Sequence, residues 1–396
     1  MNTNQYTHST YITIFTLCFY VFLLFINFFY SQIGVFDYHI QTIQHIFFHN
    51  IFIKYYDLIS YILFLIPVGL WIDKLRTYSL ITFAIILSIA LSILFLATES
   101  IYEHSLIIIY TFSLLKYILL VTSLYHASRA YLKGLLISLT IIIFIFLPSL
   151  ILNFNITFSN LNFLKYFPEE NLMFQFTILN IFLVFLMIWC IIYNNRSKVE
   201  KIKIKNLSSL RLIFFQFKNK KFGFYILVFL TLQFISLQQT INIFSVYIAI
   251  LGLLFFGIID VKIKNYYPWI LNLSLVTFAL YLILNLLGFT NISPVYYLIL
   301  NMILLFISKF YVNIFANNKL YGFSQIKGLT IAIILLTSKI MTIIVTNTDF
   351  LLIKKFGFFD NQTQLSNLFQ QFNFIIVLCI FLLIFILKIA YRKQKN

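Results

Sequence analysis

The chain is a series of long apolar runs separated by short polar turns. Each run is about 20 residues long, enough to cross a hydrocarbon core of roughly 30 Å as a helix that rises 1.5 Å per residue. The eighth run is short and its boundary with the seventh is indistinct, so the pattern allows eleven or twelve membrane helices. The predicted segments are 10–33, 51–72, 78–97, 104–126, 135–153, 172–193, 223–243, 244–259, 267–288, 293–314, 327–347 and 372–390.

The composition excludes a water-soluble globule. Hydrophobic residues make up 62% of the chain and charged residues only 10%, with a mean hydropathy of +0.96. Too little polar surface is available to cover so much apolar surface. We therefore expect an all-α polytopic membrane protein. Its richness in Phe, Ile, Asn and Lys is typical of an AT-rich bacterial genome, so Phe-rich helix faces are expected to contact lipid or the core.

The basic residues alternate by loop and predict the topology. With a cytoplasmic N-terminus, the inner loops and the C-terminal tail hold 22 of the 28 Lys and Arg residues. This bias places both termini in the cytoplasm of a cell whose inner or plasma membrane holds the protein. The first apolar run lacks a cleavage site, so we expect a retained helix. The net charge of +17 then indicates contact with anionic lipid headgroups, and nucleic acid is not an expected partner.

A basic stretch divides the chain near its middle. Residues 195–221 carry nine Lys and Arg side chains on the predicted inner side. They would link an N-terminal six-helix bundle, 1–194, to a C-terminal six-helix bundle, 222–396. The linker would be either an amphipathic segment on the inner leaflet or a solvated tether.

A short charged turn follows the second apolar run. It contains Gly69, Asp73, Lys74 and Arg76. Glycine lets two helix backbones approach closely, and an aspartate at a helix end can accept backbone N–H groups from the start of another helix while it pairs with a cation. Such a contact can form in one conformation and break in another.

A weaker copy of this turn recurs in the second half. Gly257, Asp260, Lys262 and Lys264 follow the second apolar run of that half, and Asp260 lies 187 residues after Asp73 (260 − 73). A loop repeated at half the chain length predicts two similar bundles in tandem.

The first turn resembles the signature of the major facilitator superfamily between its second and third helices. Gly69, Asp73 and Lys74 match that order, whereas Arg76 occupies the place of the second glycine. The resemblance implies about 12 transmembrane helices in two six-helix bundles that work by alternating access. It also implies a conformational latch, formed by Gly69, Asp73, Lys74, Arg76 and Asp260. The fifth segment lacks glycine, which disfavours the drug/proton antiporters of this superfamily.

Ionisable and polar side chains inside the segments are candidates for binding or coupling, because their burial in a membrane is costly. Lys116 and Lys339 lie near the middle of segments four and eleven without a carboxylate at similar depth, so an anionic solute group is an attractive partner. Segment seven is the most polar helix. The resemblance implies that helices one, four, seven and ten line a cavity. The substrate-binding or coupling candidates are Lys116, Gln233, Ser236, Thr240, Asn27, Asn301, Lys339 and Asp57.

The remaining polar clusters predict neither a metal site nor a cofactor. His45 and His49 are one helical turn apart but lack a third ligand at a fixed spacing. Cys18, Cys190 and Cys379 are far apart inside apolar runs, and we expect them to be small buried hydrophobic residues.

These features predict a monomeric secondary transporter and not an enzyme. Its substrate would be a small solute, such as an organic anion, with protons as the default coupling ion. The alternative is a polytopic glycosyltransferase that uses a lipid-linked sugar, with Asp37 and His39 in its first outer loop. That alternative lacks the acidic residues and the outer domain such enzymes usually carry.

Overall fold

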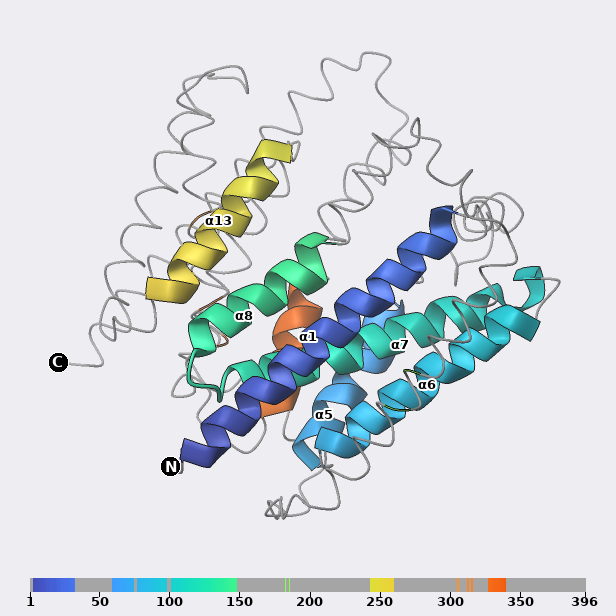
Figure 1. Ribbon diagram of the computed structural model, residues 1–396, viewed down its shortest axis with the longest axis horizontal. Coiled ribbons are helices and arrows are strands. Elements are labelled where there is room, and N and C mark those ends of the chain that lie inside the picture. The colour runs from blue at the N-terminus through green and yellow to red at the C-terminus, as the bar shows by residue number, and fades with distance from the viewer. Residues whose placement is uncertain are drawn as a thin grey trace, which may run out of the picture. The chain divides into compact units, whose positions relative to one another are not determined.

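The computed structural model describes residues 3–32, 59–74, 77–97, 101–147, 243–259 and 327–339, and the single positions 182, 185, 305, 312 and 315. These residues are helical apart from the turn at 128–132, and no strand occurs among them. The named elements, shown in Figure 1, are α1 (Thr3–Gln32), η1 (Tyr61–Leu65), α5 (Ile66–Lys74), α6 (Thr77–Ala97), α7 (Ile101–Ala127), α8 (Lys133–Ile141), η2 (Ile142–Phe146) and α13 (Ile243–Ile259).

The chain divides into two compact units that do not coincide with its two sequence halves. The first unit contains α1, η1, α5, α6 and α7, and also residues 323–336 from the second half. The second unit contains α13, and also Lys133–Ser138 from the first half. Each unit therefore joins segments from both halves of the sequence. The predicted bundles 1–194 and 222–396 remain a prediction.

Helix α7 is the centre of the first unit. It packs against α1, α5, α6 and η1 (Figure 1). Every residue from 117 to 128 is buried, as expected of a helix that is apolar on all sides and surrounded by other helices. The length of the apolar run predicted this helix well, since α6 and α7 match the expected segments 78–97 and 104–126 to within three residues.

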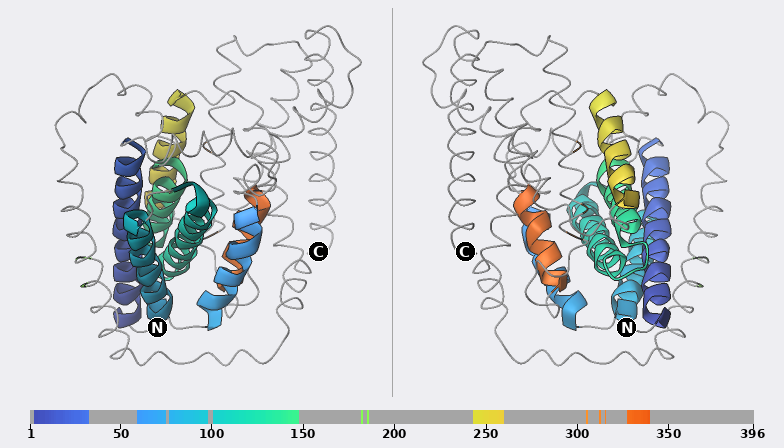
Figure 2. Two further views of the ribbon diagram at one scale, coloured as in Figure 1. Left: turned by 90° about the vertical axis from the view of Figure 1, so that its right-hand side faces the viewer. Right: turned by 90° about the vertical axis from the view of Figure 1, so that its left-hand side faces the viewer.

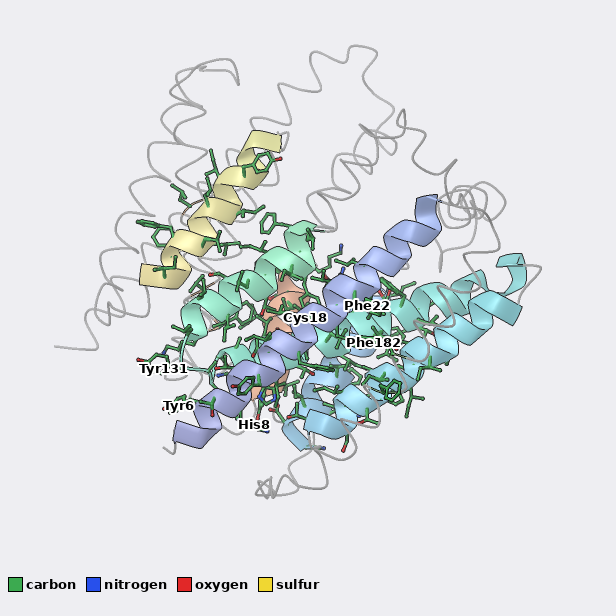
Figure 3. The ribbon with its side chains drawn as sticks, viewed as in Figure 1. Tyr6, His8, Cys18, Phe22, Tyr131 and Phe182 are labelled. Carbon is green, nitrogen blue, oxygen red and sulfur yellow. The ribbon has the colours of Figure 1, made fainter. Side chains whose placement is uncertain are left out.

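Helix α1 buries one face and exposes the other. Its buried positions include Thr13, Thr16, Leu17 and Tyr20, with Leu23 and Leu24 one turn later. This spacing follows the 3.6-residue period of a helix. The rings of Tyr20 and Phe144 stack with centroids 3.8 Å apart. Further along α1, the ring of Phe22 packs edge-to-face on that of Phe182, with centroids 5.6 Å apart. Both residues are labelled in Figure 3.

Several buried hydroxyls in this unit form hydrogen bonds within their own helix or with a neighbouring one, whereas Oγ1 of Thr122 has no partner among the described residues. Thr13 donates to the carbonyl of Ser9 at 2.9 Å, and Thr16 donates to that of Ile12 at 3.0 Å. Ser123 on α7 bonds Thr140 on α8 at 2.9 Å. Each bond removes the cost of a bare polar group away from water.

Two short π-helical turns each end two residues before a proline in the sequence. η1 ends at Leu65 and precedes Pro67, and η2 ends at Phe146 and precedes Pro148. Proline cannot donate to the carbonyl four residues earlier, and its ring crowds that carbonyl. A widened π turn upstream relieves the crowding, and the helix continues through Pro67 as α5.

The described helices are consistent with membrane crossing. Within the described ranges, one stretch, Tyr6–Leu24, is both long and apolar enough to span a bilayer alone, and shorter apolar helices occur at Ser79–Leu91, Lys133–Phe146 and Tyr247–Ile258. The expectation that Cys18 is buried was wrong. It lies on the exposed face of α1 (Figure 3), where a small apolar thiol is compatible with lipid. Cys190 and Cys379 lie outside the described residues.

We predict that Phe144→Ala destabilises the protein. Its side chain is 1% exposed and stacks on Tyr20, so truncation leaves a cavity that costs roughly 3 to 5 kcal/mol. The neighbouring Ile145, 39% exposed, provides the matched control. The melting temperature in detergent should fall by several degrees for Phe144→Ala and hardly change for Ile145→Ala. Equal losses in both variants would contradict the packing described here.

Candidate functional site

The carboxylate of Asp73 caps the start of another helix. Its Oδ1 accepts the backbone N–H of Gly328 and its Oδ2 accepts that of Leu329, both at 2.9 Å. The two donors lie in the first turn of the helix at 327–339, where N–H groups lack partners within their own helix. The helix dipole adds a partial positive charge at the same place. Asp73 therefore binds this helix end through two charge-assisted hydrogen bonds.

Two glycines allow this approach. A Cβ atom built on Gly69 would lie 2.8 Å from the carbonyl oxygen of Gly328 and 2.7 Å from the Cβ of Ala332. A Cβ atom built on Gly328 would lie 2.6 Å from the carbonyl oxygen of Gly69 and would overlap Ile72. Gly69 and Asp73 are four residues apart and thus share one face of α5. Figure 2 shows α5 and the 327–339 helix side by side.

Basic groups from two other places act on the carboxylate. Arg129, just after α7, and Lys327, at the start of the capped helix, both attract it electrostatically. Asp73 lies one residue beyond the predicted segment 51–72. Burial raises its pKa to about 6, while the two backbone N–H groups and the two cations hold the rise in check. The carboxylate is thus mostly ionised at pH 7 but close to titration.

The end of α7 supports this region. Nε2 of His126 lies 3.0 Å from the hydroxyl of Thr77, the first residue of α6. Nδ1 of the same buried ring has no hydrogen-bond partner among the described residues. The guanidinium of Arg129 lies 4.1 Å from the ring centroid of Tyr125, a cation–π contact. The first contact joins the end of α7 to the start of α6, and the second holds the guanidinium of Arg129 against α7.

The glycine of the repeated turn also lies at a close helix crossing. Gly257 of α13 faces Gly134 of α8, and a Cβ atom built on Gly134 would overlap the carbonyl oxygen of Gly257. Ser138, one turn after Gly134, donates its hydroxyl to the carbonyl of Leu253 at 2.7 Å. Asp260, the predicted latch residue of this copy, lies outside the described residues.

The two predicted intramembrane lysines are half-buried and lie deep along their helices. Lys116 is eleven residues before the end of α7, roughly 16 Å along the axis. Lys339 is twelve residues after Lys327, roughly 18 Å along its helix. Both distances correspond to the middle of a bilayer. The two lysines belong to different units.

The structure says less about the other predicted site residues. Asn27 is part of α1, but its side chain is not described. Lys74 is exposed at the end of α5. The structure describes no group of three metal-ligating side chains within its placed ranges. The candidates outside the described residues are Asp57, Arg76, Gln233, Ser236, Thr240, Asn301 and, as stated above, Asp260.

Several residues around Asp73 were not among the predicted site residues. Arg129 and Lys327 were predicted only as basic residues of the inner side, and Tyr125, His126 and Gly328 were not predicted to take part. One signal was present, because Lys327 and Gly328 open an apolar segment directly at its predicted inner end. From this pattern, Asp73 could have been predicted to accept the N–H groups at the start of the helix that contains Gly328.

We predict that Asp73→Ala loosens the start of the 327–339 helix. The change leaves the N–H groups of Gly328 and Leu329 without their acceptor, and the loss of a cap typically costs about 1 kcal/mol and at most about 2. Amide hydrogen exchange in the peptide containing these residues should accelerate roughly tenfold. Tyr131→Ala, at a position that is 76% exposed, should leave it unchanged. An unaltered exchange rate in Asp73→Ala would show that water replaces the carboxylate without cost.

We also predict a pH dependence that Asp73→Asn removes. The pKa of Asp73 is raised from 3.8 to about 6 by burial, so the contact state binds a proton more tightly than a state in which Asp73 faces water. Its contribution is complete below about pH 4 and is lost as the pH rises through about 6. Between pH 7.5 and 5, the melting temperature of the wild type should therefore rise relative to that of Asp73→Asn. A relative fall on acidification would contradict the assigned direction.

Comparison with known proteins identifies the fold. No protein-family model matches the chain, and no curated protein sequence matches it. A crystal structure of the fucose:proton symporter FucP of E. coli is similar over 95% of this chain and 96% of that chain, with a TM-score of 0.57 and 14% sequence identity. This agreement over nearly the full length of both chains confirms the predicted all-α polytopic fold, whereas the number of helices and the two six-helix bundles stay predictions. The chain therefore shares the all-α, polytopic membrane fold of that symporter.

Proposed function

We propose that the protein is a secondary transporter that moves a small solute across the membrane by alternating access. The observation that carries the proposal is the bidentate contact of Asp73 with the N–H groups of Gly328 and Leu329, in a chain with the fold of a known symporter. The contact joins sequence positions 255 residues apart through one carboxylate and two backbone N–H groups. Because so few groups take part, it can form and break as a unit during a transport cycle.

The latch is proposed to comprise Gly69, Asp73, Lys74, Arg76 and Asp260. Gly69 and Asp73 supply the close approach and the cap, as described above. Lys74, Arg76 and Asp260 are included because of their positions in the repeated turn. The charged end of α5 and its counterpart after α13 would then be equivalent elements of two bundles, 1–194 and 222–396.

An organic anion is the proposed substrate class. Lys116 and Lys339 are both half-buried and lie at a predicted depth near the middle of the bilayer, where a charged side chain is costly and often functional. An anionic group of the solute could pair with Lys116. Gln233, Ser236, Thr240, Asn27 and Asn301 would supply neutral hydrogen bonds, and Lys339 or Asp57 would take part in coupling.

A neutral sugar carried with a proton is the second candidate. It is supported by the likeness to a fucose:proton symporter and by the amide and hydroxyl groups of segment seven, which suit sugar hydroxyls. Asp73, whose pKa is about 6, is a group that can exchange a proton near neutral pH. The glycosyltransferase alternative has no comparable support.

We propose an inner or plasma membrane location with both termini in the cytoplasm, on the basis of the Lys and Arg distribution. A monomer is the proposed working unit, because each chain of this fold would contain both bundles. The lipid partners would be anionic headgroups that contact the inner basic loops.

The decisive test is uptake into proteoliposomes with a panel of small organic anions and neutral sugars, L-fucose among them, with and without a pH gradient. We expect an anion to be transported, and Lys116→Ala to reduce its uptake at least tenfold while Lys116→Arg retains a larger share. Lys393→Ala, in the C-terminal tail, is the charge-matched control and should transport normally.

The outcomes separate the two candidates. Undiminished anion uptake in Lys116→Ala would remove this lysine from the mechanism. Uptake of neutral sugars alone would overturn the anion proposal and favour the sugar symporter. The absence of uptake for every solute in both directions would contradict the transport proposal itself.

A further inference from the structure

Two buried side-chain atoms in the part of the chain that the structure describes have no hydrogen-bond partner there. They are Oγ1 of Thr122 and Nδ1 of His126. Both residues belong to α7 and are four positions apart, so their side chains lie on one face of the helix, one turn from each other. Thr122 is fully buried and His126 is 6% exposed. A bare polar atom is costly away from water, and two of them on one helix face indicate a shared partner.

The hydroxyl of Thr122 differs from other threonine hydroxyls in these helices. Thr10, Thr13 and Thr16 on α1 each donate to a carbonyl three or four residues earlier in the same helix. Thr122 could make the same bond to the carbonyl of Ile118 by rotation about one side-chain torsion. It makes no such bond, so its hydroxyl is available to a partner outside its own backbone.

The other nitrogen of the His126 ring already has a partner. Nε2 lies 3.0 Å from the hydroxyl of Thr77 at the start of α6, which fixes the orientation of the ring. A neutral imidazole carries a hydrogen on one nitrogen and a lone pair on the other. Nδ1 therefore accepts if Nε2 donates to Thr77, and it donates if Nε2 accepts. A partner that suits both arrangements must be able to donate and to accept.

The charges around the ring do not require an anion as that partner. Arg129, His8 and Lys327 all act electrostatically on His126, but Arg129 and Lys327 also attract the carboxylate of Asp73. An anion at this place would add a second negative charge near cations that already have one. It would also require the ring hydrogen on Nδ1, because an anion only accepts hydrogen bonds.

We propose that one buried water molecule binds between Thr122 and His126 and forms a hydrogen bond with each side chain. Water both donates and accepts, so it fits either position of the ring hydrogen. The carbonyl of Thr122 accepts the N–H of His126 within the helix and keeps a second lone pair, which offers a third bond. Buried waters typically make about three such bonds. Thr122, the water, His126 and Thr77 then link α7 to the start of α6, independently of the proposed transport function.

Thr122→Val tests the site by the sign of its effect, because valine has nearly the shape of threonine but lacks the hydroxyl. If a water binds there, the melting temperature in detergent should fall by roughly 2 to 4 °C. If the hydroxyl is bare, its removal relieves a desolvation cost, and the melting temperature should rise or stay the same. That second result would overturn the proposal. Thr13→Val is the matched control, since this equally buried hydroxyl bonds its own helix, and its melting temperature should change much less.

A second variant tests whether the two side chains share one partner. In His126→Gln the side-chain amide can reach the position of Nε2, so the contact with Thr77 is kept while Nδ1 is lost. Combined with Thr122→Val, it should lower the melting temperature by no more than the larger of the two single losses, because either change already removes the water. Losses that add in full would overturn the shared molecule.

Solid-state NMR of histidine-labelled protein in lipid bilayers observes the water itself. Magnetisation transfer from water should reach the ring of His126 in the wild type and should fall several-fold in Thr122→Val. The spectrum of His126→Gln identifies the signal among those of the six histidines. The absence of transfer to this ring in the wild type would overturn the proposal, and this result does not depend on whether Thr122→Val folds.

Exchange of chloride for gluconate separates water from a small anion. We expect the melting temperatures of the wild type and of Thr122→Val to respond equally to this exchange, because water is present in both buffers. A stabilisation by chloride that Thr122→Val abolishes would overturn the assignment of water and give the site to an anion.

Discussion

The start of the 327–339 helix must find partners for its first N–H groups where water is scarce, and the chain meets this constraint with a carboxylate from another helix. Asp73 binds the amides of Gly328 and Leu329 with both of its oxygens. The absence of Cβ atoms at Gly69 and Gly328 permits the approach, so glycine and aspartate one turn apart on α5 form one functional pair. The capped helix and the end of α5 consequently move together or separate at a defined place.

The energetic balance at Asp73 suits a contact that forms and breaks. Burial disfavours the ionised carboxylate, while two N–H groups and the charges of Arg129 and Lys327 favour it. Burial outweighs the other effects and raises the pKa of Asp73 from 3.8 to about 6. If the ionised form of Asp73 were stabilised much more strongly, the contact with the helix start would not break. If it were stabilised much less, the carboxyl group would stay protonated.

The sequence predicted the helices by length and the chemistry of Asp73 by residue type. It did not predict which helix Asp73 binds, because the partner lies 255 residues away and only the glycine at its start distinguishes that apolar run from the others. Helix α7 shows the same limit, since a helix buried on all sides carries no amphipathic pattern that indicates its neighbours. Cys18 was misjudged for a related reason, because a lipid-facing surface and a protein core select the same apolar residues.

Glycine carries more information in this chain than its small number suggests. The chain has 10 glycines in 396 residues, whereas average usage would supply about 28. Among the residues that the structure describes, four glycines lie at the two close helix crossings, Gly69 with Gly328 and Gly134 with Gly257. Larger residues can fill most positions in a lipid-facing helix, but none can replace glycine where two backbones touch. These four glycines therefore mark places where a helix from one sequence half meets a helix from the other.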